Sequence, residues 1–181
     1  MKGRLHYSVD KCIVKCYYLP TYFVGFIISK GVYIMKELTQ EFLDEVTAQV
    51  SQGLHCSQVV FAYGAKKLGF DETAAKKISA AFGGGMFDGE RCGSATGALM
   101  ALGLKYGHSG AADKANEAEL TEKRLEFNKR FVEKFGSLQC ADILGANIGT
   151  PEGYKRVIDE KLTRNCPALI AYTCLLLDDL L

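Results

Sequence analysis

From Met35 onward the sequence is divided into short amphipathic segments, most of which begin at a capping residue and end at a glycine. Thr39 can cap a first helix, in which apolar residues recur every four positions up to Val50, and Gly53 ends it. The same pattern predicts helical segments over 57–67, 72–82, 94–106, 113–135, 138–144, 152–162 and 167–181. No alternating pattern typical of a strand interrupts them. The sequence therefore predicts an all-α fold, a single-domain helical bundle of five to seven helices.

Residues 1–34 differ from the rest. Residues 17–29 form an apolar and aromatic run, which is shorter than the roughly 20 residues that a membrane-spanning helix needs, and Pro20 interrupts it. Three interpretations stay open: a membrane-associated anchor, an appendage, or upstream sequence outside the working domain. We favour the third, so that residues 35–181 form the domain and any membrane association involves residues 1–34 alone.

Charge and cysteine content exclude several classes of protein. The 22 Lys and Arg residues are balanced by 21 Asp and Glu residues, which argues against nucleic-acid binding through bulk charge. The 7 cysteines cannot all pair within one chain, and a chain of 181 residues can fold without disulfides. We therefore expect cysteines that carry out chemistry. A cytoplasmic location is expected as well, because free thiols persist there and no convincing export signal is present.

Four cysteines lie at the predicted helix starts: Cys56, Cys92, Cys140 and Cys166. Unpaired backbone N–H groups and the helix macrodipole favour an anion at such positions. We therefore expect lowered thiol pKa values and thiolates that act as nucleophiles or metal ligands. Arg91, directly before Cys92, would add to this effect, and His55, directly before Cys56, could act as a base or a ligand.

The other three cysteines are expected to be inert. Cys174 lies within a leucine-rich helix, and Cys12 and Cys16 are most simply small apolar residues, although their spacing could also suit a metal. No two of the four helix-start cysteines have the C-x-x-C spacing. This excludes a thioredoxin-type motif, a zinc ribbon and a haem-attachment site. Any site must therefore be assembled from four separate helix starts.

Small residues precede and follow Cys92. Gly83, Gly84 and Gly85 form a flexible loop before it, and Gly93, Gly97 and Ala101 then recur every four residues. They leave one helix face without side chains, which could serve tight helix packing, a homodimer, or the close approach of a cofactor or a second sulfur. Gly93 and Gly97 are accordingly the candidate cofactor-contacting residues.

The chain resembles the C_GCAxxG_C_C family of putative redox-active proteins over residues of about 37–175. The resemblance is carried by GLHCSQ (53–58), FGGGM (82–86), GERCGSATGALM (89–100), GLKYG (103–107), CADILG (140–145) and the cysteine before the last helix. The four family cysteines correspond to Cys56, Cys92, Cys140 and Cys166, and Ser94 stands where the motif has alanine. The resemblance implies a helical protein of about the length of residues 35–181 with a redox role.

A similar four-cysteine segment occurs in split-Soret cytochromes that carry an iron–sulfur centre, so the resemblance also implies a cluster as an alternative. Three functions stay open at this point. The first is thiol–disulfide chemistry at Cys56, Cys92, Cys140 and Cys166. The second is an iron–sulfur or other metal centre held by the same four thiolates, and the third is a helical interaction domain without catalysis. If the chain is an enzyme, we expect an oxidoreductase. Its redox partner is not encoded in a recognisable motif.

Overall fold

The computed structural model describes residues 27–28, 31–32 and 38–181. The chain divides into two compact units, Met1–Glu37 and Leu38–Leu181. In the first unit, strand β1 (Ile27–Ile28) pairs antiparallel with strand β2 (Gly31–Val32), with Ile27 opposite Val32. The expectations for Cys12 and Cys16 lie outside the described residues.

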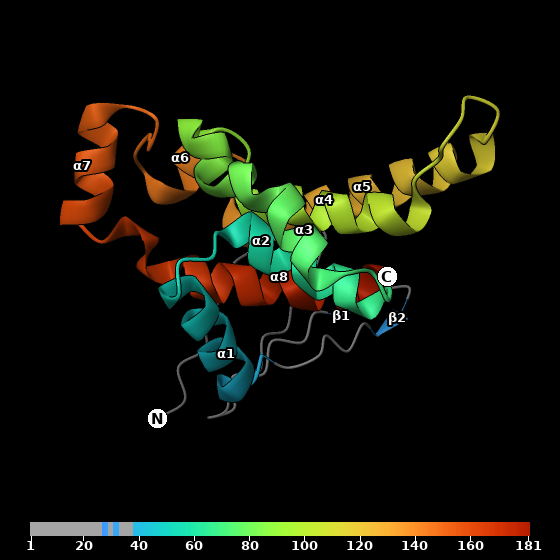
Figure 1. The fold of residues 1–181 in the computed structure, drawn as a ribbon, viewed down its shortest axis with the longest axis horizontal. Helices are drawn as coiled ribbons and strands as arrows, with labels where there is room; N and C mark the ends of the chain where they lie inside the picture. Colours follow the sequence, from blue (N-terminus) through green and yellow to red (C-terminus); the bar gives the residue numbers. More distant parts are fainter. Residues whose placement is uncertain (1–26, 29–30, 33–37) are drawn as a thin grey trace. The chain divides into compact units, whose positions relative to one another are not determined.

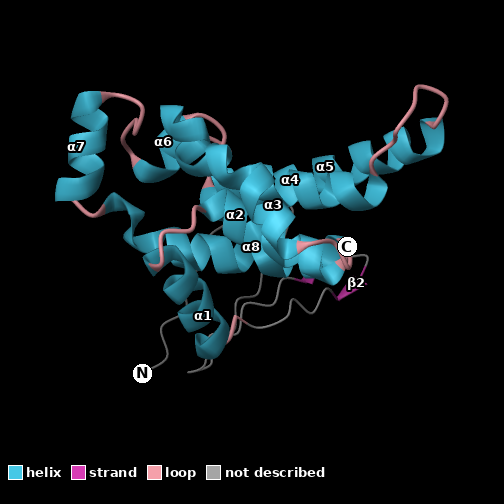
Figure 2. Cartoon of the chain, in the orientation of Figure 1, coloured by secondary structure: helices cyan, strands magenta, loops and turns pink. Residues whose placement is uncertain are grey.

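The second unit is helical, which confirms the all-α prediction (Figures 1 and 2). Its α-helices are α1 (Gln40–Ser51), α2 (Cys56–Lys67), α3 (Glu72–Ser79), α4 (Gly93–Tyr106), α5 (Lys114–Phe135), α6 (Cys140–Leu144), α7 (Pro151–Asp159) and α8 (Cys166–Leu180). The eight helices within 38–181 correspond one by one to the helical segments that the sequence indicated, and they exceed the five to seven helices expected of the bundle. Short turns of 3-10 type follow α3 and precede α8.

The helix ends follow from local side-chain chemistry. The N–H of Phe42 donates to Thr39 Oγ1 at 3.2 Å, and the N–H of Ala74 donates to Asp71 Oδ1 at 2.6 Å. Such bonds satisfy backbone donors that the first helical turn leaves unpaired. Gly136, with a φ of 81°, ends α5 in the left-handed conformation. The capping residues that the sequence indicated therefore do define these boundaries.

Helices α2 and α4 pack in parallel at very close range. A Cβ on Gly97 would lie 2.6 Å from the carbonyl oxygen of Ser57, and a Cβ on Gly64 would lie 2.5 Å from the Cβ of Ala101. Residue number rises in the same direction along both helices at these contacts, so both helix starts lie at one end. The bare face of α4 therefore aligns the start of α2 with the start of α4.

Helix α8 completes the core. It runs alongside α2 in the helical unit (Figure 1) and packs against α1, α2 and α4. It is the most apolar of the long helices, and its side chains are largely buried. Fully buried large side chains come from several elements: Val46, Val60, Leu102, Phe127, Phe131, Ile170, Leu176 and Leu177. Burying such residues is the main stabilisation of the unit.

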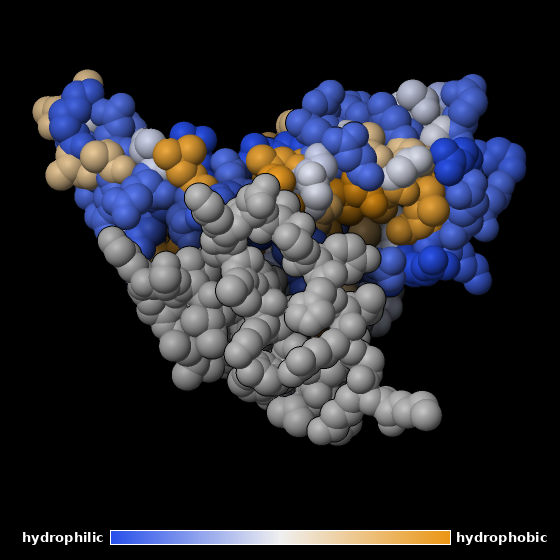
Figure 3. Space-filling view, turned by 180° about the vertical axis from the view of Figure 1, so that it is seen from behind, coloured by the Kyte–Doolittle hydropathy of each residue, from blue (hydrophilic) through white to orange (hydrophobic). Residues whose placement is uncertain are grey.

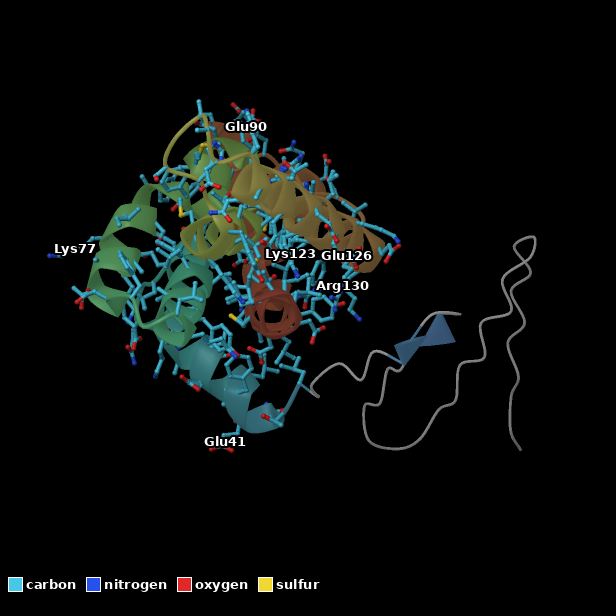
Figure 4. The ribbon with its side chains drawn as sticks, turned by 90° about the vertical axis from the view of Figure 1, so that its right-hand side faces the viewer. Glu41, Lys77, Glu90, Lys123, Glu126 and Arg130 are labelled. Carbon is cyan, nitrogen blue, oxygen red and sulfur yellow. The ribbon has the colours of Figure 1, made fainter. Side chains whose placement is uncertain are left out.

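The surface of this unit is mixed. Glu41 and Lys77 point away from the helices (Figure 4), while Ile78 and Ile158 leave 55% and 58% of their surface exposed. Hydrophobic residues also gather in a patch bordered by hydrophilic ones on the face shown in Figure 3. Across the described part of the chain, every helix is too short or too polar to traverse a lipid bilayer.

Candidate functional site

Each of the four candidate cysteines lies at a helix start. Cys56, Cys140 and Cys166 are the first residues of α2, α6 and α8, and Cys92 directly precedes Gly93, the first residue of α4. These positions agree with the sequence prediction. Cys174 is fully buried within α8, also as expected.

The parallel packing of α2 and α4 brings Cys56 next to Cys92. A Cβ on Gly93 would lie 2.5 Å from Cys56 Sγ and 2.6 Å from the carbonyl oxygen of Phe82. No Cβ could occupy that place without a shift of its neighbours. The Cys56 sulfur therefore lies directly against the residue that follows Cys92.

A short backbone pairing ties Cys92 to Cys140. The N–H of Cys92 donates to the carbonyl oxygen of Leu138 at 2.8 Å, and the N–H of Cys140 donates to the carbonyl oxygen of Glu90 at 2.7 Å. Arg91 and Gln139 are opposite each other in this antiparallel bridge. The bridge fixes the starts of α4 and α6 relative to each other, although 47 positions separate the two cysteines in sequence.

Cys140 also belongs to a small apolar cluster around α6 and α7. Its buried members are Cys140, Leu144, Ala146 and Val157, and Ile148, Leu162 and Cys166 pack against them. Cys140 and Cys166 thus share one cluster. Cys56 and Cys166 are partly exposed, whereas Cys92 and Cys140 are buried.

The pKa values of three of the thiols depend on burial and on the neighbouring thiols. Burial, and then the charges that Cys92, Cys56 and Cys166 would carry as thiolates, raise the pKa of Cys140 to about 12. Burial followed by Cys56 and Cys92 raises the pKa of Cys166 to about 12, and burial followed by Cys56 raises that of Cys92 to about 11. Each of these thiols resists ionisation in part because the others lie nearby.

The expected lowering of the thiol pKa at helix starts is therefore wrong for Cys92, Cys140 and Cys166. At Cys92 the backbone N–H groups of Ala95 and Ser94 and the Ser94 hydroxyl do lower the pKa, but burial outweighs them. The Ser94 hydroxyl is close enough to act in this sense, yet it forms no hydrogen bond of standard geometry within the described residues. Burial was not visible in the sequence, and it reverses the sign of the shift.

The two polar neighbours predicted from the sequence have other contacts. Arg91 extends to α5, where its Nη2 donates to Asn128 Oδ1 at 2.5 Å. The His55 ring lies edge-on to Phe87 with a centroid distance of 5.0 Å. A Cβ on Gly83 would lie 2.6 Å from the His55 Cβ, so this loop packs closely beside the start of α2.

The loop before Cys92 contains a turn that the sequence did not reveal. Gly84, Gly85, Met86 and Phe87 have positive φ values of 57°, 65°, 59° and 62° in succession. Non-glycine residues rarely adopt this conformation, which costs roughly 1–2 kcal/mol each. The glycine run predicted a loop, but nothing in it indicated that Met86 and Phe87 would also be left-handed.

The described residues do not fit a metal cluster as they stand. They contain no group of three or more His, Cys, Asp or Glu side chains arranged to hold a metal ion. The space beside Gly93 is taken by Cys56 Sγ and that beside Gly97 by the backbone of α2. In the structure Gly93 allows the approach of the Cys56 sulfur, and Gly97 allows the close packing of α4 on α2.

Comparisons with known proteins give one match. Residues 54–180 match the model of a family described as "Putative redox-active protein (C_GCAxxG_C_C)". The search among curated proteins gives no match, and neither does the search among solved structures. The matched region covers well over half of the chain and includes all four cysteines of the site. The chain therefore belongs to the C_GCAxxG_C_C family, whose members are described as putative redox-active proteins.

Proposed function

We propose that this protein carries out thiol–disulfide exchange. Cys56 and Cys92 are the reacting pair, and Cys140 and Cys166 are the neighbouring thiols. The observation that carries the proposal is the contact of Cys56 Sγ with Gly93, because it holds the Cys56 sulfur beside the residue that bears the Cys92 thiol. Membership of a family described as redox-active supports the same class of chemistry.

The difference in exposure assigns the order of attack. Cys56 is partly exposed and Cys92 is buried with 6% of its surface exposed, so a partner reaches Cys56 first. The Cys56 thiolate attacks a sulfur of the partner's disulfide, which forms a mixed disulfide and releases one partner thiolate. The Cys92 thiolate then attacks Cys56 Sγ and releases the second.

The overall reaction is balanced. Two protein thiols become one protein disulfide, and one disulfide of the partner becomes two thiols, so two electrons and two protons pass to the partner. The reverse reaction reduces the protein and oxidises a dithiol. The co-reactant is in either direction a molecule that carries a disulfide or a dithiol.

The test begins with protein purified without oxygen. Reduced protein is exposed to a small disulfide, and the cysteines that become linked are mapped by peptide mass spectrometry. We expect a Cys56–Cys92 disulfide to form first. Cys56→Ser and Cys92→Ser are each expected to abolish it, whereas Cys174→Ala leaves it intact, because Cys174 lies within α8 and away from the four thiols.

Two results would contradict the proposal. One is a first disulfide that excludes both Cys56 and Cys92. The other is stoichiometric iron and sulfide in the purified protein, with absorbance near about 400 nm that is lost in Cys56→Ser and Cys92→Ser, because a cluster would then occupy the thiols. A metal-free, colourless protein that forms the expected disulfide supports exchange and not a metal centre.

The cytoplasm is the proposed site of this chemistry, since thiols there are kept reduced between cycles. The functional unit proposed is residues 35–181, which contain all four cysteines and the whole of the family match.

A further inference from the structure

One hydrogen-bond donor of Arg91 is unused among the residues that the structure describes. Its Nη2 is bonded to Asn128, but its Nε is buried and has no partner within the described residues. Leaving a donor of a charged group unpaired away from water is costly. A buried donor in this state calls for an acceptor from outside the protein, such as an anion or an ordered water.

A second arginine, Arg124, lies on the same side of α5 as the partner of Arg91. Burial, and then the positive charge of Arg124, lower the pKa of Arg91, which agrees with this placement. Arg124 and Asn128 are four residues apart on α5, so they share one face of that helix. Arg91 reaches this face from the segment before α4.

Neither arginine is neutralised by a carboxylate within residues 38–181. The positions three and four residues from Arg124 on α5 are Leu120, Thr121, Phe127 and Asn128, none of which is acidic. Elsewhere on the same helix, Arg130 pairs with Asp179 at 2.6 Å. Lys123, labelled in Figure 4, lies over the ring of Tyr106 at 5.4 Å. The Arg91–Arg124 pair is therefore a local excess of positive charge.

Asn128 adds a neutral donor to the pair. Its carbonyl oxygen is occupied by Arg91, while its side-chain NH₂ group makes no hydrogen bond with the described residues. Arg91 is in contact with Asn128, and Arg124 lies one helical turn away on the same face of α5, so this part of the surface carries more donors than acceptors. A single oxyanion, such as a carboxylate or a phosphate, has the acceptors and the charge that this part of the surface lacks.

We propose that Arg91, Arg124 and Asn128 bind the carboxylate or phosphate group of a small anionic disulfide or thiol that exchanges with the cysteines. This substrate class rests on the proposed function, whereas the oxyanion site itself does not. The chain connects the oxyanion site to the thiols, because Arg91 directly precedes Cys92 in sequence. The bridge also holds the Arg91 backbone opposite Gln139. The oxyanion site therefore lies one residue from Cys92 along the chain, and the proposal is that the disulfide of a bound anion reaches the thiols from there.

The experiment compares three small disulfides on reduced full-length protein: glutathione disulfide, which carries carboxylates, coenzyme A disulfide, which carries phosphates, and cystamine, which is cationic. We expect an anionic disulfide to react faster than cystamine. Arg124→Gln should lower the rate with the preferred anionic disulfide by about tenfold and leave the cystamine rate unchanged. Whichever anionic disulfide is the faster one identifies a carboxylate or a phosphate as the group bound.

Lys129→Gln is the matched control, because it removes one exposed positive charge from α5 on a different face. It should leave the ratio of anionic to cationic rates as in the wild type. Arg91→Lys keeps the charge and removes the planar donor, so it should lower the ratio as well. Equal rates for Arg124→Gln and wild type, or equal losses in Arg124→Gln and Lys129→Gln, would overturn the proposal.

A binding measurement separates this site from the exchange reaction. Inorganic phosphate is titrated into the wild type, Arg124→Gln, and the Cys56→Ser variant, and the arginine N–H signals are followed by NMR. We expect saturable binding in the wild type and in Cys56→Ser and a loss of about tenfold in affinity in Arg124→Gln. If no disulfide reacts with any variant but phosphate still binds in this way, the exchange function fails and the oxyanion site stands. The absence of saturable phosphate binding overturns the site.

Discussion

Gly93 has no side chain, and this allows the Cys56 thiol to lie against the first turn of α4. The closeness of Cys56 to Cys92 therefore depends most directly on Gly93. Gly93→Ala places a Cβ 2.5 Å from Cys56 Sγ and 2.6 Å from the Phe82 carbonyl oxygen. We expect a loss of about 1–3 kcal/mol in the free energy of unfolding and slower formation of the Cys56–Cys92 disulfide. Urea denaturation and the rate of disulfide formation measure the two effects.

Gly103→Ala is the matched control on the same helix. A Cβ there would meet nothing within 4 Å, so the substitution should raise stability by up to about 1 kcal/mol through helix propensity. It should leave disulfide formation unchanged. Equal stability and equal rates in both variants would show that Cys56 Sγ can be accommodated when residue 93 carries a side chain.

The raised thiol pKa values predict a pH dependence for the reduced protein. Cys92, Cys140 and Cys166 have pKa values of about 11, 12 and 12 in the folded chain, against a reference value of 9.0 for an unperturbed cysteine. The folded state therefore holds protons that the unfolded state releases, and stability falls as the pH rises above about 9. Between pH 8 and pH 10 the free energy of unfolding should drop by on the order of 1 kcal/mol per thiol.

The measurement is urea denaturation of the reduced protein at several pH values in this range. The Cys92→Ala variant should show a smaller drop than the wild type, because it lacks one of the three titrating groups. A free energy of unfolding that stays constant from pH 8 to pH 10 would mean that these thiols ionise as readily in the folded chain as in the unfolded one.

At the scale of elements, the left-handed turn over 84–87 fixes how the chain enters the bridge and α4. Gly85→Ala places a Cβ 2.5 Å from the backbone N and O atoms of Glu90, whose carbonyl accepts the bond from Cys140. Gly84→Ala meets only Ile148 side-chain atoms, at 3.5 Å and beyond. Both glycines have a positive φ, so the backbone strain of alanine is similar at both positions.

The two substitutions should therefore differ in their effect. Gly84→Ala is expected to cost about 1 kcal/mol of stability, and Gly85→Ala several times more, since it also displaces Glu90. Thermal denaturation of the two variants measures the difference. Equal losses would show that the contact with Glu90 is relieved at little cost.

Most of the elements could be predicted from the sequence, because their signals are local. The capping residues Thr39 and Asp71 and the glycine at 136 are read directly, and the structure begins and ends helices there. The four helix-start cysteines were found by the same reasoning. What brings Cys56 to Cys92 is the parallel packing of α2 on α4, which joins residues far apart in the chain.

Three features could not be predicted, each for a physical reason. Burial of Cys92, Cys140 and Cys166 depends on the whole packing and reverses the expected direction of their pKa shifts. The conformations of Met86 and Phe87 are imposed by surrounding contacts against their own preference. The contact of Arg91 with Asn128 crosses from one element to another and has no sequence pattern.

At the scale of the whole molecule, the division at Glu37 predicts that the helical unit is independent. A chain that begins at Met35 should fold, keep the melting temperature of the full-length protein within about 2 °C, and form the same first disulfide, because a change under about 0.5 kcal/mol moves the melting temperature only this far. Circular dichroism and peptide mapping test this. A truncated chain that is unfolded, or that links other cysteines, would show that residues 1–34 are part of the working protein.

The bridge between residues 90–92 and 138–140 also gives the protein an internal reporter. The amide hydrogens of Cys92 and Cys140 are both donated across it, to Leu138 and Glu90. Their exchange with deuterated solvent requires that the bridge open, so the two hydrogens should exchange together and at one rate. Because both belong to thiol-bearing residues, a change of redox state that loosens the bridge would be recorded by these two amide signals, without any label attached to a sulfur.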